Sequence, residues 1–225
     1  MEIRFEEAGV TFGAYTALHS LSLTLTERRI GIIGLNGSGK TTFARLINGL
    51  AKPATGRVIV NGRDTAADQK AVLSDVGFIF QSPQNQIILP IVRDDIAFGL
   101  KSRGLGRAET EKAVAAILAR FDAAHLADRR AHELSGGELQ MAALCSVLVT
   151  EPQILILDEP TNQLDLKNRI RVKQIIAGLH EHVIVITHDL DFIGDFERVL
   201  LFHEGRLMAD ASPEEAIVRY REIAR

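Results

Sequence analysis

The sequence has 225 residues, of which 46% are hydrophobic, enough for one large domain or one domain with a sizeable insertion. Its 26 Lys and Arg against 29 Asp and Glu give a formal net charge of −3, which argues against nucleic acid as the main partner. The single cysteine cannot form an internal disulfide and favours a reducing compartment, and no apolar run approaches the roughly 18 residues that cross a bilayer.

Two kinds of strand pattern follow one another along the chain. Residues 3–5 and 21–25 alternate apolar and polar side chains, which predicts an N-terminal antiparallel β layer with one face in water. The basic pair Arg28 and Arg29 is interpreted as a solvated face. Four continuously apolar, β-branched runs then predict parallel strands buried on both faces, at residues 29–33, 76–80, 154–157 and 183–187. The chain is therefore expected to have an α/β fold.

Strand signals vanish between about residues 85 and 150. Segments rich in Ala, Leu, Glu, Lys and Arg predict helices there, at residues 93–101, 108–121 and 137–149. We expect a helical subdomain, residues 85–149, inserted into a catalytic core formed by residues 1–84 and 150–225. A closing hairpin is predicted over residues 199–208, and a last helix begins with Ser212 as its N-cap.

The clearest motif is a glycine-rich loop between a strand and a helix. Residues 34–42 read GLNGSGKTT and fit G-x-x-x-x-G-K-[ST], in which backbone N–H groups and a helix N-terminus surround phosphates. An ordinary glycine turn would need no lysine and threonine at this register. We expect Lys40 to reach the β- and γ-phosphates of ATP and the Thr41 hydroxyl to bind Mg²⁺. The expected nucleotide-binding residues of this loop are Asn36, Gly37, Ser38, Gly39, Lys40, Thr41 and Thr42.

Two acidic residues follow a fully apolar strand. Asp158 and Glu159 come directly after residues 154–157, and a carboxylate buried there needs a compensating cation. Mg²⁺ would compensate Asp158, and Glu159 is then placed to activate water at the γ-phosphate. Taken alone, the two residues could equally be a solvated turn. The glycine-rich loop upstream favours the catalytic interpretation.

Two further predicted strands also end in polar residues. Gln81 follows residues 76–80, and His188 with Asp189 follows residues 183–187. The carboxyl ends of parallel strands lie on one edge of a sheet, where ligands bind, so these side chains should converge on Glu159. We expect Gln81 and His188 to contact the γ-phosphate or orient water, with Gln81 also a metal ligand. The alternative for either residue alone is a cap or loop role.

A second candidate anion site begins at residue 134. Residues 134–140 read LSGGELQ, in which Ser135 predicts an N-cap and two glycines open a helix. Backbone N–H groups at such a helix start could receive an anion, although the pattern by itself names no substrate.

The three motifs together resemble those of ATP-binding-cassette (ABC) ATPases. LSGGE stands between the glycine-rich loop and ILILDEP, and the resemblance covers essentially the whole chain. It implies a single domain, residues 1–225, with a P-loop NTPase core of the RecA-like kind. It also implies that the chain binds and hydrolyses ATP with Mg²⁺.

The resemblance further implies a site shared between two chains. In this family two cassettes pair head to tail, and each signature closes over the ATP held by its partner. Asp165 would be the dimer-contact aspartate, and an aromatic residue near the first core strand would stack on adenine, Phe12 at the best spacing and Tyr15 as the alternative. Glu138 and Gln163 stand where Gln and a small residue are usual. The residues expected at the partner's nucleotide are Ser135, Gly136, Gly137 and Glu138.

A narrower resemblance concerns the segment after Gln81. Residues 81–91 and 94–100 are similar to the extended glutamine loop of energy-coupling-factor importers, although Gln84 stands where Asp is usual. With residues 31–50, the similarity leans towards ATPases of biotin transporters. It implies a transmembrane coupling subunit, a substrate-binding membrane subunit, a second ATPase subunit that is identical or homologous, and a peripheral position on the cytoplasmic face of the inner membrane.

Two other functions remain as alternatives. A soluble cassette acting on DNA or ribosomes would separate its P-loop and signature by long coiled coils or carry two cassettes, and this chain does neither. A non-hydrolysing ATP-binding regulator is disfavoured by Glu159 and His188.

Overall fold

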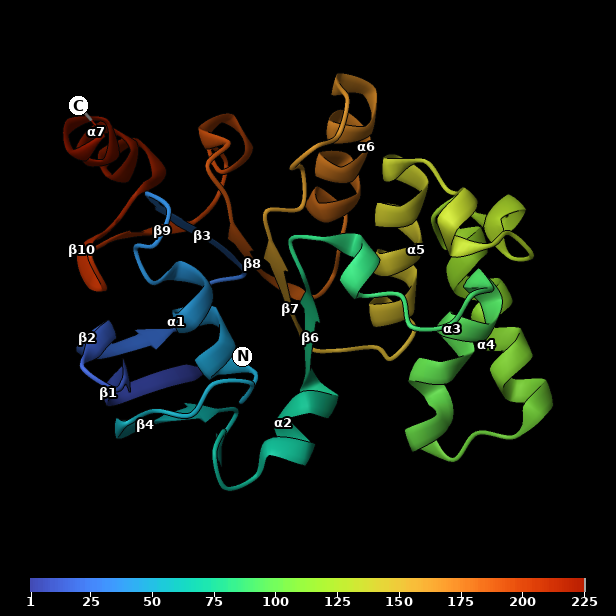
Figure 1. The fold of residues 1–225 in the computed structure, drawn as a ribbon, viewed down its shortest axis with the longest axis horizontal. Coiled ribbons are helices and arrows are strands. Elements are labelled where there is room, and N and C mark those ends of the chain that lie inside the picture. The colour runs from blue at the N-terminus through green and yellow to red at the C-terminus, as the bar shows by residue number, and fades with distance from the viewer. Residues whose placement is uncertain (225) are drawn as a thin grey trace.

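The chain forms two β-sheets, and the computed structural model describes residues 1–224 of it. The smaller sheet is antiparallel in the order β2-β1-β4-β5; the larger has the order β10-β9-β3-β8-β7-β6 and is parallel except for its edge strand β10 (Figure 1). The strands are β1 (Ile3–Phe12), β2 (Tyr15–Leu25), β3 (Arg29–Gly34), β4 (Thr55–Val60), β5 (Arg63–Asp64), β6 (Val76–Ile79), β7 (Ile154–Asp158), β8 (His182–Ile186), β9 (Arg198–His203) and β10 (Arg206–Ala211).

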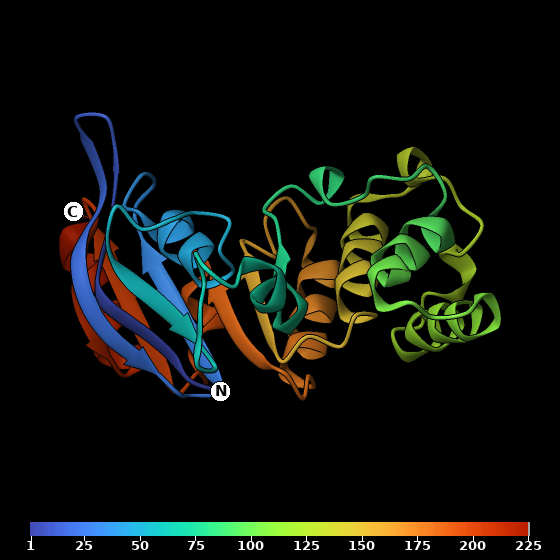
Figure 2. The ribbon, with the colours of Figure 1, turned by 90° about the horizontal axis from the view of Figure 1, so that it is seen from below.

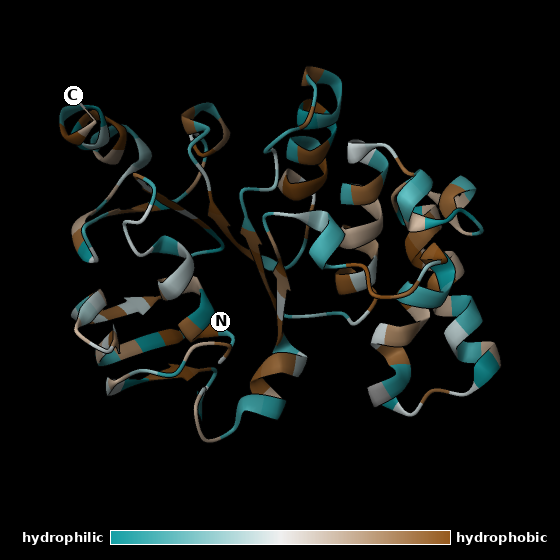
Figure 3. Ribbon diagram, viewed as in Figure 1, coloured by the Kyte–Doolittle hydropathy of each residue, from teal (hydrophilic) through white to brown (hydrophobic). Residues whose placement is uncertain are grey.

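The predicted parallel strands are confirmed, and their continuous apolar sequence has a direct cause. Successive side chains of a strand point to opposite faces, and both faces of this sheet are covered. In β7, Ile154 and Ile156 enter the core shared with the antiparallel sheet, whereas Leu155 and Leu157 enter the core shared with the helices on the other face. Figure 3 shows β6, β7 and β8 as an apolar centre between more polar elements.

Helices flank the parallel sheet on both faces. Helix α1 lies on the face of the antiparallel sheet, where Phe43 stacks on Phe5 with ring centroids 4.4 Å apart. Helices α5 and α6 cover the opposite face. The α-helices are α1 (Lys40–Ile47), α2 (Gln69–Asp75), α3 (Val92–Leu100), α4 (Arg107–Arg120), α5 (Gly136–Leu148), α6 (Leu166–Ala177) and α7 (Pro213–Ile223). The 3-10 turns are η1 (Pro83–Asn85), η2 (Lys101–Arg103), η3 (Ala124–Leu126), η4 (Ala131–Glu133) and η5 (Leu190–Phe192).

The helices predicted between residues 85 and 150 correspond to α3, α4 and α5. They stand between β6 and β7 in the chain, and α3 and α4 lie at the end of the molecule opposite the antiparallel sheet (Figure 2). The sequence patterns missed β4 and β5, which complete that sheet. The closing hairpin and the Ser212 N-cap are confirmed by β9, β10 and α7.

The interpretation of Arg28 and Arg29 as a solvated face holds for Arg28, which is exposed, and is wrong for Arg29. Arg29 is half-buried and donates from Nη2 to Leu179 O at 2.5 Å and from Nη1 to Glu181 O at 2.8 Å. The guanidinium of Arg28 donates to Leu179 O and His180 O. Both side chains therefore pair with carbonyl groups at and just beyond the C-terminal end of α6, which otherwise lack partners.

Candidate nucleotide-binding site

The glycine-rich loop connects the end of β3 to the start of α1. Gly37 and Gly39 have φ of 76° and 97°, which glycine adopts readily, and a Cβ on Gly39 would lie 2.7 Å from Ala17 O. Lys40 folds across the loop, and its Nζ donates to Gly34 O at 2.8 Å and to Leu35 O at 2.9 Å. Burial lowers the pKa of Lys40, and the charges of Glu159 and Asp158 offset part of this. The loop thus holds one cation beside a helix N-terminus, as phosphate binding requires.

Thr41 joins this loop to the end of β7. Its Oγ1 donates to Asp158 Oδ2 at 3.0 Å, and Asp158 is only 5% exposed. Burial raises the pKa of Asp158; the Thr41 hydrogen bond lowers it in part, and the charge of Glu159 raises it further. This carboxylate therefore lacks full compensation by the protein.

The donors at this point suit a magnesium ion. Within residues 1–224 no three His, Cys, Asp or Glu side chains are grouped so as to hold a metal by themselves. Mg²⁺ commonly uses one or two protein oxygens together with water and substrate phosphates, so a hydroxyl and one under-compensated carboxylate fit it. Thr41 and Asp158 could hold the ion, which would neutralise phosphate charge.

Glu159 and His188 meet at the ends of the neighbouring strands β7 and β8. Glu159 has a left-handed backbone, with φ of 52°, and its N–H donates to Ile186 O at 2.8 Å. Its Oε2 lies 2.8 Å from His188 Nδ1 and also accepts from the His188 N–H at 3.3 Å. A carboxylate oriented by an imidazole beside Asp158 is suited to positioning a water molecule.

Gln81 lies just beyond β6, next to β7 in the sheet, and is exposed. Within the described residues, no hydrogen bond connects its side chain to Asp158, Glu159 or His188. The structure therefore places Gln81 at the end of the strand next to β7, but in the described part of the chain its side chain does not contact Asp158, Glu159 or His188 through a hydrogen bond.

Phe12 and Tyr15 face each other across the β1–β2 turn and are 62% and 60% exposed. Both line a hollow beside the glycine-rich loop, whose other lining residues are Ala17, Gly37, Ser38, Gly39, Lys40, Thr41 and Thr42. Either ring could stack on a base whose phosphates enter the loop.

The signature residues begin α5. Ser135 is the N-cap, as predicted, and its Oγ accepts from the Glu138 N–H at 3.4 Å. The Ser135 Oγ–H and N–H donate to Glu138 Oε2 at 2.7 and 2.8 Å, which lowers the pKa of Glu138. Glu138 thus closes a capping box on Ser135 and does not point freely into solvent.

The signature also packs on the start of α6, a contact that sequence reasoning missed. Asp165 caps α6 and accepts from the Asn168 backbone N–H at 2.8 Å and from its Nδ2 at 3.1 Å. The Asn168 side chain occupies the space where Gly137 lacks a Cβ, since an added Cβ would lie 2.3 Å from Asn168 Cγ. Only the Asp165-x-x-Asn168 spacing, typical of a helix start, hinted at this role.

One chain does not bring its signature and its glycine-rich loop together. The two begin helices α5 and α1, which pack on opposite faces of the parallel sheet (Figure 1). Gly136 and Gly137 therefore lie apart from Lys40 within one chain.

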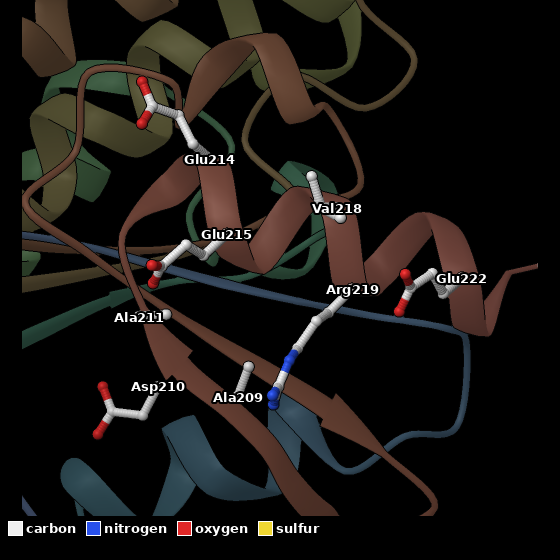
Figure 4. Close-up of a pocket in the computed structure, with 8 residues that line it drawn as sticks. All are labelled: Ala209, Asp210, Ala211, Glu214, Glu215, Val218, Arg219 and Glu222. Carbon is white, nitrogen blue, oxygen red and sulfur yellow. The ribbon is translucent and has the colours of Figure 1, made fainter.

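A separate hollow between β10 and α7 is unsuited to a triphosphate (Figure 4). Arg198 already pairs with Asp210, with Nη2 2.6 Å from Oδ2, and Arg219 donates to Met208 O. The remaining charged side chains of this hollow are acidic and would repel phosphate. They are Glu214, Glu215 and Glu222.

The comparisons with known proteins agree with this geometry. A sequence profile of the family described as ABC transporter matches residues 18–162. The chain belongs to this family and is an ABC-type ATPase that couples ATP hydrolysis to transport.

Its relatives include transport ATPases. The chain is 75% identical over 224 residues to the biotin transport ATP-binding protein BioM of Rhizobium etli, and the alignment covers 100% of both. It is 39% identical to the energy-coupling factor transporter ATP-binding protein EcfA1 of Halalkalibacterium halodurans, over 82% of this chain and 68% of that protein.

Solved structures share the fold. CbiO1 from Clostridium perfringens, described as part of the ABC transporter complex cbiONQ, matches with a TM-score of 0.84 at 30% identity, over 99% of this chain and 92% of that one. The cassette MJ0796, a dimer in a post-hydrolysis state bound to ADP and Pi, matches with a TM-score of 0.83 at 26% identity, over 94% and 98% of the two chains.

Proposed function

We propose that this chain is the ATP-hydrolysing subunit of an energy-coupling-factor importer whose transported solute is biotin. The full-length similarity to BioM supports the solute, and the similarity to EcfA1 and CbiO1 supports the type of importer. The observation that carries hydrolysis is the pairing of Glu159 with His188 beside Asp158.

The residues of the site divide the chemistry between them. Lys40 and the N-terminus of α1 bind the phosphates, and Thr41 and Asp158 hold Mg²⁺, with Gln81 as a third ligand when the nucleotide is bound. Glu159 accepts the proton of the attacking water, and His188 orients Glu159 and contacts the γ-phosphate. Asn36, Gly37, Ser38, Gly39 and Thr42 complete the phosphate contacts.

The complete site needs two chains. Because α1 and α5 lie on opposite faces of the sheet, Ser135, Gly136, Gly137 and Glu138 serve the nucleotide of a second ATPase subunit, and Asp165 contacts that subunit. The dimeric form of MJ0796 supports this arrangement. Two identical chains form the pair, with a homologous cassette as the alternative second subunit. ATP between them favours closure by its higher affinity for the closed state.

The domain organisation follows from the same scheme. Residues 1–225 form one ATPase domain, in which residues 1–84 and 150–225 bind nucleotide and residues 85–149 form a helical subdomain that carries the signature. The position of α3, α4 and α5 between β6 and β7 supports this division.

Closure and reopening of the two cassettes drive conformational change in membrane partners. No helix within residues 1–224 is both long and apolar enough to traverse a bilayer. The chain acts peripherally, on the cytoplasmic face of the inner membrane, bound to a transmembrane coupling subunit and a substrate-binding membrane subunit. The description of CbiO1 as part of a transporter complex supports such partners.

Purification of the tagged chain from detergent-solubilised membranes tests this function. We expect small integral membrane proteins to co-purify, and the complex in liposomes to take up labelled biotin when ATP is present. The Glu159→Gln complex is the matched control and should assemble without uptake. Sedimentation of the chain with ribosomes or DNA, and no membrane partner, would instead support the soluble class of cassette.

A further inference from the structure

Asp189, the residue after His188, is held by two cations of α6. Its Oδ2 lies 2.8 Å from Arg169 Nη2 and 3.0 Å from Lys173 Nζ, and its side chain is 7% exposed. Burial would raise the pKa of Asp189, but the hydrogen bonds and charges of Arg169 and Lys173 outweigh it and hold the pKa below its usual value. The carboxylate is thus ionised and fixed in one direction.

Asp189, whose carboxylate is held in this way, directly follows His188, whose imidazole ring is largely exposed. The His188 side chain is 63% exposed, and its ring contact is with Glu159 through Nδ1. An exposed ring gains little orientation from packing, so its direction depends on the backbone that carries it. That backbone is held from the Asp189 side, where the Asp189 N–H also donates to Thr187 Oγ1 at 3.0 Å and Thr187 is buried at the end of β8.

Arg169, one of the two cations that hold Asp189, lies close to Asp165, the proposed dimer-contact aspartate. The Arg169 N–H donates to Asp165 O at 2.9 Å within the first turn of α6. Arg169 therefore links the start of this helix to the segment that carries His188. The Arg169 side chain is 41% exposed, so its ion pair with Asp189 contributes little to stability, whereas its directional hydrogen bond can specify one arrangement.

We infer that Asp189, clamped by Arg169 and Lys173, is a positioning residue that keeps the His188 imidazole against Glu159. It touches neither nucleotide nor metal and acts through His188. This inference deepens the proposed function and rests on it for the role of His188 in hydrolysis.

The decisive variant is Arg169→Met, because residue 169 is remote from His188 in sequence and its loss leaves Lys173 to keep Asp189 paired and the chain folded. Asp189→Asn removes both pairs. Lys167→Met is the matched control, since Lys167 is an exposed cation on the same turn of α6. Two readouts are compared for all three: the His188 ring signals in ¹H–¹⁵N spectra of the nucleotide-free protein, assigned with His188→Ala, and the steady-state kinetics of ATP hydrolysis.

We expect the His188 ring signals to move in Arg169→Met and Asp189→Asn and to stay at the wild-type position in Lys167→Met. A misplaced catalytic group lowers turnover by about 10-fold to 100-fold, so kcat should fall within that range in Asp189→Asn and less in Arg169→Met. The KM for ATP should stay within about twofold of the wild-type value, because Lys40 and the rest of the glycine-rich loop, which supply most of the phosphate contacts, are unchanged.

His188 signals that stay unchanged in Arg169→Met and Asp189→Asn would overturn the inference, as would kcat values equal to that of Lys167→Met. A parallel rise in KM with loss of thermal stability would also contradict it, because that result shows a general structural role. Failure of the proposed function is distinguishable, since the wild-type protein would then lack hydrolysis while the nucleotide-free spectra still report on His188.

Discussion

Glu159 Oε2 lies 2.8 Å from His188 Nδ1, across the ends of β7 and β8. We propose Glu159 as the base, and its replacement by Gln keeps the shape of the side chain but removes the proton acceptor. The kcat should therefore fall by about 100-fold or more while ATP binding persists. Because the bound ATP is then not hydrolysed, closed dimers should accumulate. Phosphate release and size-exclusion chromatography with Mg-ATP measure both effects. Turnover at the wild-type rate would show that another group accepts the proton.

Ser135 and Ser212 both cap a helix, although only Ser135 also donates to the side chain of the residue three positions later. Each Oγ accepts from the backbone N–H three residues later at 3.4 Å. Ser135→Ala and Ser212→Ala should therefore each cost about 1 kcal/mol of unfolding free energy. Only Ser135→Ala should also abolish hydrolysis while leaving ATP bound to Lys40, because we propose that only the Ser135 hydroxyl contacts the partner's nucleotide. Equal hydrolysis by the two variants would place the signature outside the site.

The buried carboxylate of Asp158, the proposed Mg²⁺ ligand, lowers the stability of the nucleotide-free protein. Its pKa is raised by burial above the unfolded value, so the charged form is disfavoured at neutral pH and the penalty shrinks as pH falls through that raised pKa. Asp158→Asn keeps an acceptor for Thr41 without the charge. We expect the melting temperature of the nucleotide-free protein to rise by about 2–4 °C and Mg-dependent hydrolysis to disappear.

Calorimetry of Asp158→Asn without nucleotide and hydrolysis assays across a magnesium titration give the two measurements. Asp165→Asn, at an exposed position, serves as the control for charge removal and should leave the melting temperature nearer that of the wild-type protein. A lower melting temperature in Asp158→Asn would mean that its carboxylate is compensated within the fold.

Alanine variants of Phe12 and Tyr15 can show which of the two rings stacks on adenine, because only loss of the stacking ring should strongly weaken ATP binding. Stacking of a base on an aromatic ring contributes about 1–3 kcal/mol, so loss of the stacking ring should weaken ATP binding by about 5-fold to 150-fold. We expect this for Phe12→Ala and a smaller change for Tyr15→Ala, measured by equilibrium binding of a fluorescent ATP analogue. A larger loss in Tyr15→Ala would assign the adenine contact to Tyr15.

Local sequence patterns were sufficient to predict the parallel strands and the motifs. The continuous apolar run of residues 154–157 could be predicted as a doubly buried strand because both faces of β7 are covered. The Ser135 N-cap could be predicted because a cap depends on neighbouring residues alone. By contrast, the apolar run of β4 is only three residues long, and the first three residues of the strand are exposed, so its pairing with β1 left little signal.

The amino-acid sequence by itself determined which chemical groups are present and on which edge of the sheet they fall, because periodicity and strand ends are local properties. Only the tertiary structure decided which groups touch. Arg29 reaches carbonyl groups about 150 positions further along the chain, and Arg169 reaches Asp189 from another helix. Such contacts depend on how elements that are distant in sequence pack together. The hydrophobic periodicity around either partner does not depend on the contact, so the sequence pattern cannot reveal it.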